Sequence, residues 1–372
     1  MQLYYLNRVT EPLKTKKDVV SVLAPSSNGV SRRQFVGFTA GALLALFANG
    51  CTVSNKRRLN IYNYSFYIAP DTLKNFRQES GIEVIYDEFS SQDVLFAKLK
   101  LGAGYDLIVA TDYMLRRLIQ QQLVDTIDGF AYYDKMMDLF KVEPWTSLCR
   151  YCVPYLWGTT GIAFNSAKVK EQPSSWADLW NPKYRNRITM LDEKRDAIGA
   201  ALILLGYNGN STNTRELLEA KEKLLEQKSI LRQYTNDYID GLAREEIWLA
   251  QAWSGDVSRS RASNPRISYS LPKEGSFLFV DSWCIPKDAE HKREAIEFLN
   301  YVMQPESISK VTNFTSYPNS IATSLPLIDK SLVDNPLGYP PQEMLARTFA
   351  QEDIGAKEKE WDRLWEDIKF RH

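Results

Sequence analysis

"LNIYNYSFYIAPDTLKNFRQES", residues 59–80, places a predicted strand directly before a predicted helix. Strict alternation along the strand directs Tyr62, Tyr64 and Phe66 to one face. Tyr67 closes the turn that follows, and a proline in the first helical turn and a glycine beyond the last are typical of helix ends. The stretch therefore predicts a strand–helix unit with aromatic side chains concentrated at the strand tip.

The same order recurs twice downstream, with strands predicted over residues 81–89 and 105–110 and a helix after each. The first of these helices begins after a serine cap. Its apolar stripe is expected to consist of Val94, Leu95, Leu99 and Leu101. Such alternation predicts right-handed crossovers and a parallel sheet. Ligands of these sheets bind beyond the carboxyl ends of the strands, which here are Tyr64–Tyr67 and Thr111–Tyr113.

A second series of strands and helices begins after residue 165. Strands are predicted at 188–191 and 247–253, helices at 197–207 and 214–228, and an extended passage at 267–286. A glycine-containing turn is expected between Trp253 and the helix after it. The chain is expected to pass between two similar α/β lobes near Trp157 and again near Asp281.

The composition is that of an ordinary globular protein, with 44% hydrophobic and 25% charged residues in a chain of 372. The formal net charge of zero conceals an asymmetry. Residues 1–58 hold nine Lys and Arg against two Asp and Glu, which leaves 37 against 44 in the rest of the chain. An acidic body argues against binding to nucleic acid and suits a cationic ligand.

The stretch "SRRQFVGFTAGALLALFANGC", residues 31–51, has the layout of an export signal. The paired Arg32 and Arg33 precede an apolar run of fourteen residues, 35–48, which is too short to span a bilayer as a helix. The arginines resemble a twin-arginine export signal. The end of the stretch resembles a lipoprotein processing site, which would make Cys51 the lipidated first residue. A buried N-terminal helix is the alternative.

Cysteine and histidine usage argues against several classes of enzyme. The two histidines, His291 and the C-terminal residue, are too few for a histidine-based metal site or a Ser–His hydrolase. Cys149 and Cys152 have the spacing of a redox pair but stand in an apolar, strand-like run, which favours packed thiols. No GxGxxG, Walker, HExxH or GxSxG motif is present. We therefore expect neither a cofactor nor a metal.

From about Leu59 onward the chain resembles the spermidine/putrescine-binding proteins that serve ABC-type polyamine importers. The matching segments are "IYNYSFYIAPDTL", "YDLIVATDYM", "VPYLWGTTGIAFN", "SWADLWNPKYRNRI", "GLAREEIWLAQAWSGDV", "LPKEGSFLFVDSWCIP", "FLNYVMQPE" and "YPP". The resemblance implies an α/β fold of the two-lobed type II periplasmic binding protein class, with two crossover segments and a ligand cleft between the lobes. It also implies a monomer that delivers its ligand to a permease in the cytoplasmic membrane.

The expected organisation follows from the leader and the resemblance together. An export signal with its extension covers 1–50, an anchor linker 51–58, the first lobe 59–158 and 281–326, and the second lobe 159–280 and 327–372. The expected location is the periplasm or cell envelope, with a lipid anchor after export.

The resemblance also implies a set of ligand-binding residues, aromatic, hydroxylic and acidic. They are Tyr64, Ser65, Tyr67, Thr111, Tyr113, Glu193, Asp196, Trp253, Asp256, Phe279, Asp281, Tyr317 and Gln351. Two positions depart from the family pattern: Tyr64 replaces a usual tryptophan, and Phe66 stands where better-known relatives have an acid.

These residue types suit a flexible chain with ammonium groups at its ends. Aromatic faces contribute about 0.5–2 kcal/mol by cation–π contact. A carboxylate near 4 Å contributes about 4 kcal/mol before its desolvation is counted. Each residue alone also has a plain structural interpretation: the aromatics as core, Asp281 as a turn cap, and Glu193 and Asp196 as a solvated helix end.

Two other classes of function remain open at the level of sequence. A receptor of the same fold could bind ferric iron through paired tyrosines, or a phosphonate through basic residues, but the candidate residues are acidic and aromatic. A glycosidase with a carboxylate pair is the enzymatic alternative.

Overall fold

The computed structural model describes residues 57–89 and 91–370. The predicted export signal with Arg32 and Arg33, and the predicted lipidation site Cys51, lie outside these residues. No helix within the described ranges is long and apolar enough to cross a membrane.

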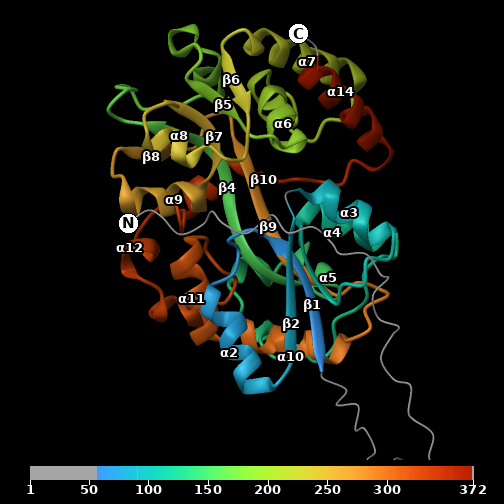
Figure 1. Cartoon of the computed structure of the whole chain (residues 1–372). Coiled ribbons are helices and arrows are strands. Elements are labelled where there is room, and N and C mark those ends of the chain that lie inside the picture. The colour runs from blue at the N-terminus through green and yellow to red at the C-terminus, as the bar shows by residue number, and fades with distance from the viewer. Residues whose placement is uncertain (1–56, 90, 371–372) are drawn as a thin grey trace, which may run out of the picture. The chain divides into compact units, whose positions relative to one another are not determined.

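The first sheet is built from three parallel strands in the order β2-β1-β3, as the alternating pattern predicts (Figure 1). Their bounds are Arg58–Tyr64 for β1, Glu83–Phe89 for β2 and Leu107–Thr111 for β3. Strand β9 (Ser276–Cys284) joins β3 antiparallel, so that Thr111 lies opposite Asp281. Two predicted ligand contacts therefore lie opposite each other on neighbouring strands, at the carboxyl end of β3.

The second sheet continues from β4 (Val153–Asn165) in the order β4-β7-β5-β6. Its further strands are β5 (Ile188–Met190), β6 (Leu231–Tyr234), β7 (Leu249–Trp253) and β8 (Ile267–Ser270), which pairs with β4. The short β10 (Thr348–Ala350) pairs with β9.

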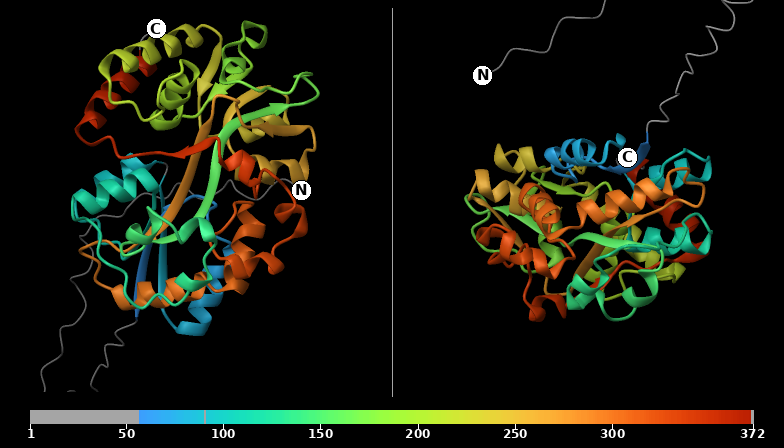
Figure 2. Two further views of the ribbon diagram at one scale, coloured as in Figure 1. Left: turned by 180° about the vertical axis from the view of Figure 1, so that it is seen from behind. Right: turned by 90° about the horizontal axis from the view of Figure 1, so that it is seen from below.

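Strands β4 and β9 connect the two lobes (Figure 2). The first half of β4 pairs antiparallel with β9, and its second half pairs with β7 and β8. Trp157 lies opposite Val280 and Leu156 opposite Asp281 within this ribbon. The two segments predicted to cross between the lobes are therefore hydrogen-bonded to each other.

Helices cover the sheets of both lobes. They are α2 (Pro70–Ser80), α3 (Gln92–Lys100), α4 (Asp112–Gln120), α5 (Trp145–Leu148), α6 (Lys194–Leu204), α7 (Thr214–Lys228), α8 (Ile239–Ala243), α9 (Ser254–Ser263), α10 (Lys292–Val302), α11 (Pro305–Thr315), α12 (Lys330–Val333), α13 (Gln342–Leu345) and α14 (Glu358–Phe370). Short 3₁₀ turns occur at Tyr133–Lys135, Asp138–Phe140, Trp176–Trp180, Pro182–Tyr184, Ala322–Leu327 and Gly355–Lys357.

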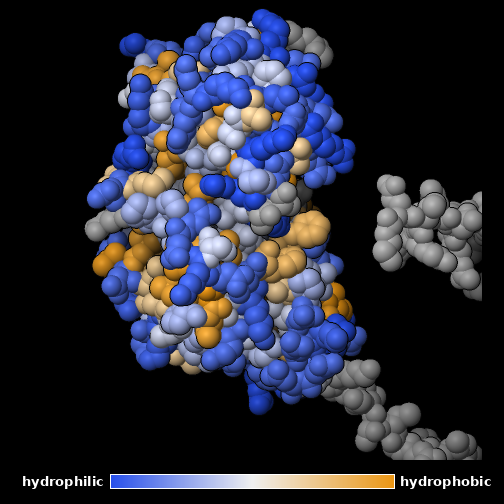
Figure 3. All heavy atoms as spheres, turned by 90° about the vertical axis from the view of Figure 1, so that its left-hand side faces the viewer, coloured by the Kyte–Doolittle hydropathy of each residue, from blue (hydrophilic) through white to orange (hydrophobic). Residues whose placement is uncertain are grey.

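Each lobe has its own hydrophobic core. The first is built around β1, β3, α4, α10 and α11, and the second around α6, α7 and α14, with a neighbouring cluster beneath α8 and α9. Trp283 and Phe298 pack edge to face in the first core, and Trp176 and Trp361 are fully buried in the second. The face in Figure 3 is mostly hydrophilic, with hydrophobic patches mainly over its lower half.

Three local predictions are wrong. Of the expected stripe on α3, Leu95 and Leu99 are buried, but Val94 is 41% exposed and Leu101, beyond the helix end, 86%. The predicted turn after Trp253 is absent, because α9 begins at the next residue. The Cys149–Cys152 run is not a strand, since it turns before β4.

Candidate ligand-binding site

The tips of β1 and β3 are held together by one side chain, Gln92 of α3. Its amide nitrogen donates to the Tyr64 hydroxyl at 2.6 Å, and its oxygen accepts from the Thr111 backbone N–H at 3.2 Å. The Tyr64 ring contacts those of Tyr67 and Phe89, with centroids 5.4 and 4.4 Å away. The aromatic strand tip is therefore fixed in place rather than loose.

Asp281 is the acid that this aromatic group surrounds. The Tyr67 hydroxyl donates to its Oδ2 at 2.6 Å, while its Oδ1 has no hydrogen-bond partner among the described residues. Burial raises the pKa of Asp281 to about 7; the Tyr67 hydrogen bond opposes this rise and the charge of Asp196 adds to it. A buried carboxylate oxygen without a partner is costly unless a ligand cation meets it.

Aromatic rings continue from Tyr67 toward the second lobe. Tyr317 lies 5.3 Å from Tyr67 and 6.1 Å from Phe279, measured between ring centroids. Gly255 makes room for this ring, because a Cβ there would lie 2.4 Å from Tyr317 ring atoms. The glycine of the "WSGD" segment is thus needed for the position of a predicted ligand contact.

Asp256 and Trp253 stand at the start of α9, where Tyr238 links them. The Tyr238 hydroxyl donates to Asp256 Oδ2 at 3.1 Å and accepts from the Trp253 N–H at 3.0 Å. Burial raises the pKa of Asp256, against the nearby charge of Arg259 and the hydrogen bonds of two tyrosines.

Glu193 and Asp196 belong to the start of α6. The Asn236 amide donates to Glu193 Oε1 at 3.2 Å, and the Thr160 hydroxyl donates to Asp196 Oδ1 at 2.7 Å. Burial and the charge of Asp196 raise the pKa of Glu193 to about 8. Burial raises the pKa of Asp196 to about 6, although hydrogen bonds from Thr160 and Gln351 lower it.

Some of the predicted site residues interact across the two lobes. Besides burial, the charges of Asp281 and Glu193, one from each lobe, act together to raise the pKa of Tyr64. Tyr317 of the first lobe bonds to Asp256 of the second, whereas Gln351 and Asp196, which also bond, both belong to the second lobe. The arrangement offers acids near aromatic faces, which is the chemistry that an organic ammonium requires.

Ser65 is the predicted residue whose side chain turns away. It is exposed, and its hydroxyl donates to Glu88 at 2.7 Å. The next residue, Phe66, has a positive φ of 57° and is 70% exposed, so the chain reverses direction here before Tyr67 points back inward.

Sequence reasoning missed three residues that shape the site: Gln92, Tyr238 and Asp112. Asp112 is buried, accepts the Tyr113 N–H at 2.9 Å, and has a second oxygen without a hydrogen-bond partner in the described ranges. Burial raises its pKa to about 8. Its place between two predicted contacts in "TDY" was the available signal. Nothing in the local pattern marked Gln92 or Tyr238.

The described cysteines are not among these residues. Cys149 is partly buried, Cys152 and Cys284 are buried, and all three are free thiols. Burial raises the pKa of Cys152, which disfavours a reactive thiolate. No group of three or more His, Cys, Asp or Glu suited to a metal occurs among residues 57–89 and 91–370.

The chain is similar to a known protein family and to several individual proteins. Residues 71–337 match the family described as bacterial extracellular solute-binding protein. The putrescine-binding periplasmic protein SpuD of Pseudomonas aeruginosa is 33% identical over 85% of this chain and 93% of its own. PotF of Escherichia coli, also a putrescine-binding periplasmic protein, is 32% identical over 91% and 98%. The TpPotD lipoprotein of Treponema pallidum superposes with a TM-score of 0.77 at 26% identity, over 84% of this chain and all of that one.

Proposed function

The chain belongs to the bacterial extracellular solute-binding protein family, and from that premise we propose that it is the polyamine-binding component of an ABC-type uptake system. The match to relatives named for putrescine, or for spermidine and putrescine, extends over nearly the whole length of those relatives. The observation that carries the proposal is Asp281, a buried acid that accepts the Tyr67 hydroxyl at one oxygen and whose other oxygen has no hydrogen-bond partner among the described residues.

Capture would rely on acids at the ends of the ligand and rings along its methylene chain. Asp281 and Asp256 would hold the two ends, and Glu193, near Asp196, would approach the inner ammonium of a longer polyamine. Tyr64, Tyr67 and Tyr317 would cover the hydrocarbon. Because these residues come from both lobes, the ligand would be enclosed when the lobes meet. Iron and phosphonate receptors need a bound anion or basic residues instead, and this acidic set disfavours both.

Calorimetric titration of the mature domain with putrescine, cadaverine, spermidine and spermine tests the proposal. We expect binding of at least one polyamine and a loss of about ten- to a hundredfold in Asp281→Asn, the scale of a charged hydrogen bond. Unchanged ligand after prolonged incubation would support a receptor, whereas turnover would favour an enzyme. Failure of all four to bind would refute the ligand class.

We also propose that the protein is exported through Arg32 and Arg33, anchored in the cell envelope through Cys51, and active as a monomer that docks on its permease. The lobe boundaries proposed are 59–158 with 281–326 and 159–280 with 327–372. Replacing both arginines with lysine should leave precursor in the cytoplasm. Normal export of that variant would refute the twin-arginine signal. Cys51→Ala should abolish anchoring without changing the affinity of the purified domain.

A further inference from the structure

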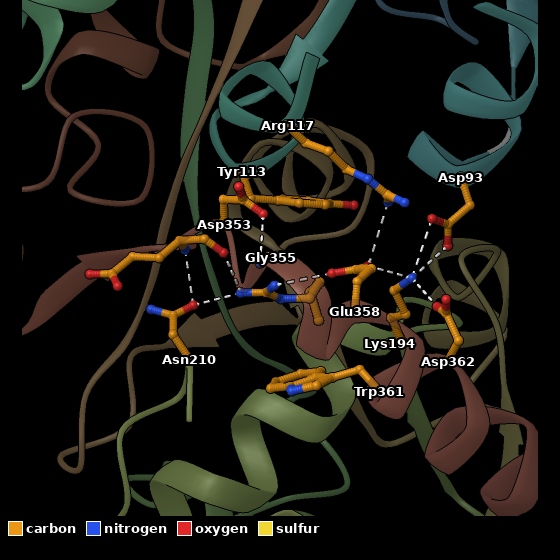
Figure 4. A network of polar contacts seen from close by, with 12 residues as sticks. Asp93, Tyr113, Arg117, Lys194, Asn210, Asp353, Gly355, Glu358, Trp361 and Asp362 are labelled. Atoms are coloured by element: carbon orange, nitrogen blue, oxygen red, sulfur yellow. Dashed lines mark hydrogen bonds and ion pairs between the residues drawn. The ribbon is translucent and has the colours of Figure 1, made fainter. Parts of the chain in front are cut away.

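Beside the proposed ligand contacts, a group of charged side chains joins the two lobes directly (Figure 4). The group, here called the latch, consists of Asp93, Arg117, Lys194, Arg195, Glu358 and Asp362. Asp93 and Arg117 belong to α3 and α4 of the first lobe, and the other four to α6 and α14 of the second. Three cations thus face three carboxylates.

Lys194 is the centre of the latch. Its ammonium donates to both oxygens of Asp93, at 3.2 and 3.0 Å, and also contacts Glu358 at 2.6 Å and Asp362. The side chain is only 4% exposed. Burial acts to lower the pKa of Lys194, but Asp93 and Glu358 outweigh it and keep the group charged. The ammonium therefore depends on a partner from the opposite lobe.

Two further contacts cross between the lobes near Lys194. Arg117 approaches Glu358, with Nη1 and Oε1 3.9 Å apart. The buried guanidinium of Arg195 lies between two rings, 5.2 Å from the centroid of Tyr113 in the first lobe and 4.8 Å from that of Trp361 in the second. A cation between two aromatic faces is favourable when water is excluded.

Separation of the lobes would remove a defined part of these contacts. Lys194 would keep Glu358 and Asp362 but lose Asp93, and Arg117 would lose Glu358. Arg195 would keep Trp361, together with its hydrogen bonds to Asn210 and the Glu352 carbonyl, but lose Tyr113. Opening would therefore break these contacts between the lobes, at a cost that involves no ligand atom and is reduced by the water that reaches the separated charges.

We propose that the latch stabilises the closed arrangement of the lobes and so raises ligand affinity, with Asp93 and Arg117 acting as positioning residues that do not touch the ligand. The proposal depends on the proposed function only in requiring a solute between the lobes. Because closure is common to all ligands, loss of the latch lowers affinity for putrescine and spermidine by the same factor.

Three substitutions separate the latch from direct electrostatics. Asp93→Asn removes a negative charge and Arg117→Gln a positive charge from the first lobe. Acting through space on a cationic ligand, these changes would have opposite effects. Loss of the latch weakens binding in both, by about three- to tenfold for Asp93→Asn and about twofold for Arg117→Gln. Asp362→Asn is the matched control, because Asp362 contacts the same ammonium with similar exposure, 46% against 54%, but from the same lobe.

Calorimetry with putrescine and spermidine gives the affinities, and thermal unfolding confirms that each variant folds. Weaker binding in both first-lobe variants, with Asp362→Asn within about twofold of the parent, supports the latch. Affinity changes of opposite sign in Asp93→Asn and Arg117→Gln overturn it, as do equal losses of affinity in Asp93→Asn and Asp362→Asn. If the parent binds neither polyamine, the proposed ligand is wrong. The ligand-free radius of gyration by small-angle scattering then decides: a larger radius in Asp93→Asn supports the latch, and an equal one overturns it.

Discussion

Individual acids of the candidate site are held far from their ordinary titration range. Burial raises the pKa of Asp196 to about 6, of Asp281 to about 7 and of Glu193 to about 8, from ordinary values of 3.8 for aspartate and 4.5 for glutamate. Since folding disfavours their ionised forms, they lower the stability of the unliganded protein progressively as pH rises from about 4 to about 8. A cationic ligand reverses this preference by pairing with the ionised forms.

Ligand affinity should therefore depend on pH. We expect binding of putrescine to strengthen from pH 5 to pH 8 and to release protons, because the ligand favours carboxylates that are partly protonated without it. Calorimetry in two buffers of different ionisation enthalpy at each pH measures the number of protons released. The Asp281→Asn variant should release fewer protons when it binds the ligand. Affinity that is constant over this range would contradict the raised pKa values.

Glu193 should distinguish ligands by their number of charges. Spermidine has a third ammonium within its chain, and Glu193, at the start of α6 one turn before Asp196, is the acid that we propose meets it. We expect Glu193→Gln to weaken spermidine more than putrescine, by about 1–3 kcal/mol, the scale of a lost charged hydrogen bond. Competition titrations of both ligands against the variant measure the difference. Equal losses would assign Glu193 a general electrostatic role only.

At the scale of elements, the sequence predicted strands and helices far better than side-chain directions. The helix at residues 70–80 has the predicted bounds, because Pro70 and Gly81 determine both ends locally. Leu101 was misjudged because it lies past a helix end, and the exposed side chain of Ser65 was not foreseen because the chain reverses at the next residue, Phe66, with a positive φ. The family pattern supplied the aromatic and acidic residues. It could not supply Gln92 or the latch, which depend on pairings between segments distant in the sequence.

The junction of β7 and α9 offers a test of element packing. In Gly255→Ala the new methyl group would overlap Tyr317, so we expect a loss of about 1–3 kcal/mol in folding stability, typical of overpacking, together with weaker polyamine binding. Gly81→Ala is the control, because Gly81 ends α2 at a φ of 70° with nothing within 4 Å of a new Cβ. It should cost about 1–2 kcal/mol of stability and leave affinity unchanged.

Chemical denaturation measures the folding stability of both variants, and calorimetry measures their affinity for polyamine. Equal affinity in Gly255→Ala and the parent would show that Tyr317 is not a ligand contact, even if stability falls.

At the scale of the molecule, the same pair of strands carries a proposed ligand contact and connects the two lobes. Strands β4 and β9 run antiparallel between the lobes, and Asp281 lies within the paired segment. The Trp157 indole N–H donates to the Asn319 carbonyl at 3.1 Å, which ties the ribbon to the first lobe. A ligand that contacts Asp281 would therefore contact the connection between the lobes itself.

Ligand binding should close the lobes about this ribbon, near Trp157 and Asp281. The proposed contacts are divided, with Tyr64 and Tyr113 in the first lobe and Glu193 and Trp253 in the second, and one small ligand can satisfy both groups only when the lobes meet. We expect a smaller radius of gyration by small-angle scattering at saturating polyamine than without it. Asp281→Asn should need more ligand to reach the same compact state, because closure follows occupancy. A radius that does not change on saturation would indicate that the lobes are already closed before the ligand arrives or that the ligand binds elsewhere.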